Sequence, residues 1–216
     1  MARRRPTTQN HGGKIMDNLT KEMRETAVRV LLSSTGEDTN REGLIDTPTR
    51  VAKMYEEVFG GYKIDPKELL ERTFAEDAGI EEPDSNGNIN YLQGMVIVRD
   101  IKFYSHCEHH MVPFFGTVHV GYIPNKKVVG ISKIARVVDA FARRLQIQER
   151  LTKQIADTIQ EVLQPQGVMV IVEAEHLCMK MRGIKNPCAD TVTSTVRGLF
   201  EQAPTRQEFL QLIRRG

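Results

Sequence analysis

Residues 105–116 read SHCEHHMVPFFG and place metal-binding side chains directly before a run of apolar residues. The first six positions contain three of the chain's six histidines and one of its three cysteines. Cys107 and His110 are three residues apart, so one tight turn can present both side chains to a single ion. Because zinc in proteins is bound by cysteine sulfur and histidine nitrogen, the stretch predicts a turn that carries part of a zinc site.

Strand-like sequence flanks this turn on both sides. Residues 95–104 (MVIVRDIKFY) and 116–123 (GTVHVGYI) are rich in β-branched and aromatic residues. In the second segment Val118, Val120 and Tyr122 alternate with polar or small residues, which is typical of a strand with one buried face. A β-sheet therefore begins around the turn.

Helical spacing follows the second strand. Apolar residues share one helical face from Ser132 to Phe141 and again from Leu151 to Val162, and Pro165 ends the second pattern. We expect two helices in succession over these segments.

Two further strands and a short helix complete the predicted domain. Residues 167–176 and 191–200 have strand composition, and Thr205 with Glu208 predicts a capping box for a last helix. The resulting order ββααββ indicates an α+β fold in which helices pack on one face of an antiparallel sheet.

The part of the chain before the sheet is predicted to be helical. Residues 17–32 show apolar helical spacing, and Thr47 as N-cap with Pro48 at the first helical position begins a second helix that ends at Gly60. Residues 76–90 are acidic and rich in turn formers, as in a linker. We therefore divide the chain into a disordered basic arm (1–16), a helical section with its linker (17–90) and a domain that contains the sheet (91–216).

Composition narrows the possible functions. The chain has 216 residues, of which 40% are hydrophobic, enough to form a core. Thirty Lys and Arg against 28 Asp and Glu give a formal charge of +2, too balanced for general nucleic-acid binding. No apolar run approaches the ~20 residues of a membrane span. Three cysteines without a secretory apolar segment favour the reducing cytoplasm.

The third zinc ligand has to come from one of the two remaining cysteines. Cys178 follows His176 by two residues at the end of a predicted strand, whereas Cys188 lies in the turn-like KNPCAD without a neighbouring histidine. We choose Cys178, so that Cys107, His110 and Cys178 leave one coordination position free, as in catalytic zinc sites. A structural zinc site is disfavoured because paired CxxC or HxxxH spacings are absent.

Two histidines would then lie beside the metal without binding it. His109 and His176 are candidates for a general acid and a general base, and zinc would lower the pKa of bound water toward ~7 and permit hydrolysis at neutral pH. A buried apolar cysteine and a hydrogen-bonded structural histidine are the competing interpretations, and the residues alone leave them open.

Three segments together resemble GTP cyclohydrolase I: CEHHMVPFFGTVHVGYIPN (107–125), GISKIARVVDAFARRLQIQERLTKQIA (130–156) and HLCMKMRGI (176–184). The resemblance extends from about residue 46 to the C-terminus. It implies a tunnelling fold for the catalytic domain 91–216, in which antiparallel sheets of several subunits join into a barrel. It also implies a homodecamer with active sites at subunit interfaces.

The resemblance also implies the reaction and its residues. GTP and water would give formate and 7,8-dihydroneopterin triphosphate, the first step of folate and tetrahydropterin synthesis. Protonation of guanine N7 by His109 or His176 would make C8 electrophilic, and the histidines and Ser132 would move protons in the later steps. The zinc ligands implied are Cys107, His110 and Cys178. The substrate-binding residues implied are Gln148 and Glu149 for guanine, and Arg50, Lys53, Lys133, Arg136 and Arg182 for the triphosphate.

Three other functions agree less well with the sequence. A zinc-stabilised nucleic-acid module using the basic arm is disfavoured by the balanced charge. A tunnelling-fold enzyme acting on the pterin product is disfavoured by the QER segment and the five cations, which suit GTP. A catalytically silent zinc scaffold is disfavoured because every expected site position is present. Neither a nucleic acid nor a membrane is therefore expected as a partner.

Overall fold

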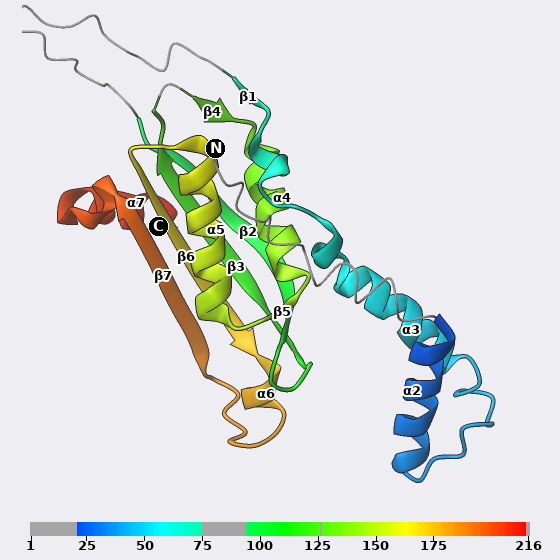
Figure 1. Ribbon diagram of the computed structural model, residues 1–216. Coiled ribbons are helices and arrows are strands. Elements are labelled where there is room, and N and C mark those ends of the chain that lie inside the picture. Colours follow the sequence, from blue (N-terminus) through cyan, green and yellow to red (C-terminus); the bar gives the residue numbers. More distant parts are fainter. Residues whose placement is uncertain (1–20, 75–93, 126, 215–216) are drawn as a thin grey trace, which may run out of the picture. The chain divides into compact units, whose positions relative to one another are not determined.

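The structure is a computed structural model that describes residues 21–74, 94–125 and 127–214 (Figure 1). These residues form two compact units that divide between Lys63 and Ile64, whereas the sequence predicted a boundary at 90/91. The predicted arm (1–16), the first residues of the first helix and the linker (76–90) lie outside the described residues.

The boundary comes earlier because residues after Lys63 pack with the sheet. The 3-10 helix η2 (Glu68–Leu70) places Leu70 in the main core with no exposed surface. The short strand β1 (Thr73–Phe74) pairs antiparallel with β4 (Val128–Val129). The second unit therefore begins at Ile64, well before the predicted start of the sheet domain at residue 91.

The first unit contains α2 (Lys21–Ser34), α3 (Thr47–Val58) and the 3-10 helix η1 (Gly60–Lys63). Both predicted helices are confirmed. The predicted N-cap is wrong, because Asp46 is the N-cap and Thr47 is the first helical residue. An ion pair joins Arg24 to Glu56 across α2 and α3.

A five-stranded sheet is the centre of the second unit, in the order β5-β2-β3-β6-β7. Neighbouring strands from β2 to β7 are antiparallel, as predicted, and β5 pairs in parallel with the end of β2. The strands are β2 (Val96–Cys107), β3 (Pro113–Ile123), β5 (Leu145–Gln146), β6 (Gly167–His176) and β7 (Asp190–Gly198).

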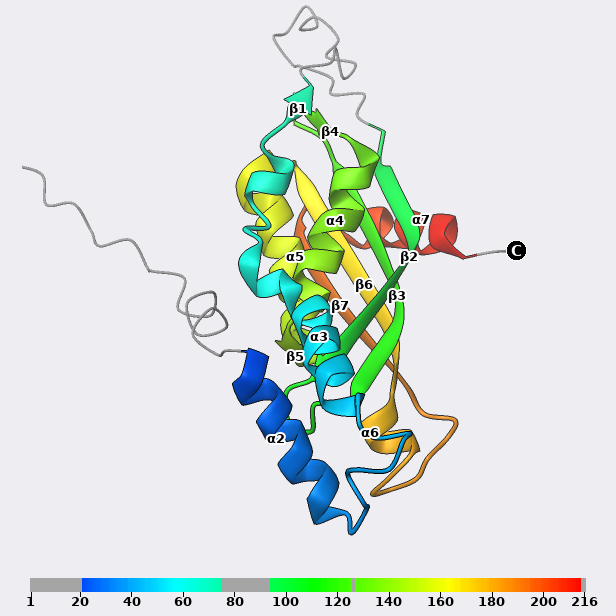
Figure 2. The same ribbon diagram turned by 90° about the vertical axis from the view of Figure 1, so that its right-hand side faces the viewer.

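Helices α4 (Ile131–Ala142) and α5 (Gln148–Leu163) cover one face of this sheet (Figures 1 and 2). Alternate residues of the central strands, such as Val118, Val120 and Val170, are fully buried in the core beneath these helices. Because successive side chains of a strand point to opposite faces, the apolar ones lie on the face that packs against the helices. This arrangement is the α+β fold that the sequence predicted.

On the opposite face, the described residues cover one end of the sheet. There Phe200 of η3 (Leu199–Glu201) and Phe209 of α7 (Ala203–Ile213) form a second buried cluster with residues that include Met169 and Ile171. The predicted capping box at Thr205 is wrong, because α7 begins at Ala203 with Gln202 as its N-cap. Among the described helices, none is both long and apolar enough to cross a bilayer.

Candidate metal centre

The three predicted zinc ligands come together where two strands end. Cys107 is the last residue of β2, His110 lies in the turn to β3, and Cys178 lies in α6 (Leu177–Lys180), which follows β6. Both β2 and β6 are antiparallel to β3, so their carboxyl ends lie at the same end of the sheet. Figure 1 shows the β2–β3 turn, β5 and α6 gathered there.

The turn itself is closed by backbone hydrogen bonds. Cys107 N–H donates to the carbonyl of Val112 at 2.9 Å, and Met111 N–H donates to the carbonyl of Cys107 at 2.8 Å. Met111 has a φ of 53°, in the left-handed region that few residues other than glycine adopt. The tight turn thus folds His110 back over Cys107.

The donor atoms of Cys107, His110 and Cys178 all lie within 4.8 Å of one another. The Sγ of Cys107 is 3.7 Å from Nδ1 of His110, and it is also 3.8 Å from Nδ1 of His109. Cys107 is buried and Cys178 half-buried, while Cys188 is exposed and does not belong to this group. Two sulfurs and one imidazole so placed match the donor types that zinc prefers.

The protonation state of the Cys178 thiol depends on its burial and on the nearby Cys107. Burial, followed by the nearby Cys107, raises the pKa of the Cys178 thiol. Both causes disfavour a second negative charge beside Cys107, and a divalent cation between the two sulfurs would offset them. Without a cation, the surroundings of Cys178 therefore favour its neutral thiol.

Three residues that sequence reasoning missed hold the turn against α5. The guanidinium of Arg150 forms an ion pair with Glu108, and its Nε donates to Oε1 of Gln146 at 3.1 Å. The backbone N–H of Glu108 donates to the carbonyl of Gln146 at 3.0 Å. The only sequence signal was that Glu108 stands inside the CEHH motif.

His176 is held from two sides beside the ligand group. Its Nε2 is 2.7 Å from Oε1 of Gln148, and its ring stacks on Phe114 with centroids 4.6 Å apart and planes inclined by 4°. Burial lowers the pKa of His176, and the negative charge of Glu149 opposes this shift. Sequence reasoning paired His176 with Cys178 but missed Phe114, whose position follows from the register Phe114↔His176 of β3 and β6.

Gln148 and Glu149 both belong to the first turn of α5 but differ in exposure. The side chain of Gln148 is buried and hydrogen-bonded, with 2% of its surface exposed. Glu149 is exposed and close enough to act electrostatically on His176. Arg182, also exposed, follows α6 and lowers the pKa of Cys178 as a minor contribution.

The remaining predicted residues belong to other elements. Ser132, Lys133 and Arg136 lie in the first turns of α4, whereas the last turn of α4 leads to β5 and the ligand end of the sheet. At 1.5 Å of rise per residue, about 15 Å of helix separates Ser132 from that end. Arg50 and Lys53 belong to the other unit and are exposed on α3, where Arg50 pairs with Asp46 at 3.3 Å.

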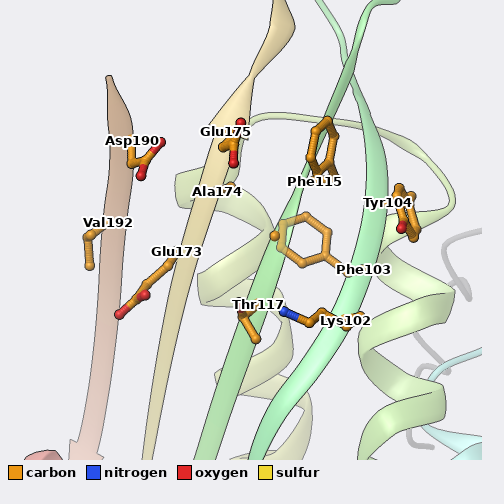
Figure 3. Close-up of a pocket in the computed structure, with 11 residues that line it drawn as sticks. Lys102, Phe103, Tyr104, Phe115, Thr117, Glu173, Ala174, Glu175, Asp190 and Val192 are labelled. Carbon is orange, nitrogen blue, oxygen red and sulfur yellow. The ribbon is translucent and has the colours of Figure 1, made fainter. Parts of the chain in front are cut away.

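A pocket of about 500 Å³ lies elsewhere, on the sheet face that the helices leave open (Figure 3). Two rows of paired residues line it, Lys102, Thr117, Glu173 and Val192 in one row and Tyr104, Phe115, Glu175 and Asp190 in the next. None of the predicted site residues contributes to its lining. The candidate site is therefore the ligand end of the sheet, not this pocket.

Comparison with known proteins gives one consistent result. The sequence profile of the GTP cyclohydrolase I family matches residues 24–214. GTP cyclohydrolase 1 of Geobacillus kaustophilus is 55% identical over 192 residues, which cover 88% of this chain and 95% of the relative. GTP cyclohydrolase 1 of Bacillus cytotoxicus is 53% identical over 201 residues, with 92% and 99% covered. That of Carboxydothermus hydrogenoformans is 55% identical over 195 residues, with 89% and 94% covered.

Proposed function

The chain belongs to the GTP cyclohydrolase I family, and from this premise we propose that it converts GTP and water to formate and 7,8-dihydroneopterin triphosphate with the aid of a zinc ion. The observation that carries the proposal is the close approach of the donor atoms of Cys107, His110 and Cys178 at the end of the sheet. The product would enter folate and tetrahydrobiopterin synthesis.

The ligand group suits a catalytic ion better than a structural one. Within the described ranges, one group of three or more such side chains could hold a metal, and it offers three donors rather than four. A zinc ion bound there would act as a Lewis acid and lower the pKa of a coordinated water toward about 7. The ion would thus be available for chemistry and for substrate.

Two imidazoles adjoin this group and would move protons. His176 precedes the ligand Cys178 by two residues, and Nδ1 of His109 is 3.8 Å from Sγ of Cys107. Either ring can deliver a proton to guanine N7 and so make C8 electrophilic. Ser132 would serve proton transfers at the ribose.

Glu149 would recognise guanine. Its carboxylate is exposed in the first turn of α5 and acts electrostatically on His176 at the edge of the metal centre. One carboxylate can accept both the N1–H and the 2-amino hydrogens of guanine as a bidentate pair. Guanine held in this way would lie beside His176.

The triphosphate needs several cations, and the predicted ones come from separate parts of the chain. Lys133 and Arg136 lie at the far end of α4, and Arg50 and Lys53 belong to the other unit. A homodecamer whose active sites lie at subunit interfaces would let a neighbouring protomer supply these charges, while Arg182 comes from the loop after α6. The three free thiols suit a reducing cytoplasm.

The test is to incubate the purified protein with GTP and to measure formate and the fluorescence of the oxidised pterin, with and without a zinc chelator. We expect both products from GTP, their loss on chelation and their return when zinc is added back. Folded, zinc-loaded protein that gave neither product would refute the proposed reaction. Product formation that survived complete zinc removal would refute the role of the metal.

A further inference from the structure

The side chain of Gln148 is not placed as a substrate-binding side chain would be. It is the first residue of α5, and its amide is buried between that helix and strands β6 and β7. Nε2 donates to the carbonyl of Val172 at 2.9 Å and to the carbonyl of Thr191 at 2.9 Å. Its whole donor capacity is thus spent inside the protein.

These two bonds fix which way the amide points. A carboxamide has two N–H donors and one oxygen, and a flipped amide would place its oxygen against two carbonyl oxygens. Oε1 must therefore face the third partner, Nε2 of His176, at 2.7 Å. Since an amide oxygen only accepts hydrogen bonds, Nε2 of His176 has to carry the hydrogen.

The ring of His176 is also fixed in its plane. Phe114, which has no exposed surface, stacks against it almost in parallel. The imidazole is consequently held by one hydrogen bond in its plane and one aromatic contact on its face. A neutral His176 held in this way keeps its hydrogen on Nε2 and leaves the lone pair on Nδ1.

We propose that Gln148 is a positioning residue that fixes the ring of His176 in its Nε2–H form through their 2.7 Å hydrogen bond, so that Nδ1 is the ring nitrogen left with its lone pair beside the metal centre. This inference rests on the proposed function and deepens it. It assigns to Gln148 a role through His176, in place of the direct contact with guanine that the family resemblance implied. The hydrogen on Nε2 stays in the bond to Gln148, and the orientation of the ring is set by that bond and by Phe114.

The first test is the tautomer of His176 in the zinc-loaded full chain. Nitrogen-15 labelling of histidine, with His176→Ala to assign the signal among six histidines, distinguishes the two neutral tautomers by long-range hydrogen–nitrogen correlations. We expect hydrogen on Nε2 and an unprotonated Nδ1. Hydrogen on Nδ1 would overturn the inference, and this result requires no variant of Gln148 to fold.

The second test is a double-mutant cycle with Gln148→Met and His176→Ala. Gln148→Met should lower kcat for GTP by about 10²-fold or more and change KM by less than about threefold. In the His176→Ala background the same substitution should have little further effect, because its target is gone. A rise in KM for GTP in both backgrounds would instead show direct substrate contact and overturn the inference.

Thr152→Val is the matched control for loosening of α5. Oγ1 of Thr152 bonds the carbonyl of Gln148 at 2.7 Å and Oγ1 of Thr193 at 2.6 Å, so it ties the same helix turn to β7 without touching His176. Its removal should leave kcat nearly unchanged. An equal loss in kcat would reduce Gln148 to a structural role. Absence of any turnover by the unsubstituted protein would refute the proposed function, while the tautomer would still test this inference.

Discussion

The ligand end of the sheet and the predicted phosphate-binding cations differ in how completely one protomer builds them. At the ligand end, contacts between described residues fix three features. These are the group of donor atoms, the turn that carries Cys107 and His110, and the adjoining His176. Four of the predicted cations have exposed side chains on α3, on α4 or in the loop after α6: Arg50, Lys53, Arg136 and Arg182. Under the proposed function, the difference predicts that the metal centre forms within one protomer, whereas the triphosphate is bound by cations from separate elements.

The sharpest way to break this comparison is to remove one metal ligand. Cys178→Ser should lower zinc affinity by more than about 100-fold, beyond the loss typical of residues that only support a ligand, and should abolish most formate release. Metal content per protomer after desalting and the rate with GTP measure both effects. The matched control is Cys188→Ser, whose thiol is exposed and outside the ligand group, and it should keep both zinc and activity. Equal zinc loss in the two variants would contradict the assignment of Cys178.

A smaller effect is expected from the residue that would bind guanine. Glu149→Ala removes an acceptor of two hydrogen bonds to a charged group, each worth about 1.5–3 kcal/mol, so KM for GTP should rise by at least about 10-fold. Binding of inorganic triphosphate, measured by competition, should change little. Glu161→Ala on the same helix is the control, since Glu161 pairs with Lys67 at 2.5 Å on the surface. Unchanged KM for GTP in Glu149→Ala would sink the guanine assignment.

The smallest effect belongs to single exposed cations. Arg50→Ala should raise KM for GTP by about two- to fivefold at low salt, as for exposed ion pairs of up to about 1 kcal/mol, and the effect should fade as salt is added. Arg41→Ala, in the same unit and paired with Glu37 at 2.8 Å, should leave KM unchanged. A loss as large as that of Cys178→Ser would erase the contrast between the two regions.

The parts of the fold that sequence predicted are those whose pattern is local. Strand 167–176 was predicted at the observed bounds, because its apolar residues and β-branched side chains extend over its whole length. β5 was missed, since two residues paired in parallel leave no periodic signal. The predicted strand 191–200 is too long, because Gly198 has a φ of 61° and ends β7, where a side chain's Cβ would lie 2.1 Å from the carbonyl oxygen of Gln166.

Prediction of the site had the same limit. Cys107, His110 and Cys178 could be grouped from spacing and residue type, and the structure brings them together. The bonds that give Gln148 its position reach Val172 and Thr191, which lie far along the chain, and nothing in QER signals them. Contacts of this kind arise from the stacking of a helix on two strands, which a single sequence does not encode locally.

The placement of the ligands at separate strand ends has a consequence for unfolding. Cys107 and Cys178 bracket a stretch of chain that contains β3, α4, α5 and β6. An ion bound to both would close a loop of about 70 residues, as a covalent cross-link does, and would restrict the unfolded chain. Release of the ion and fraying of this end of the sheet would then be a single event. The amount of bound zinc would then determine how stable this end of the sheet is against unfolding, as well as how fast the reaction runs.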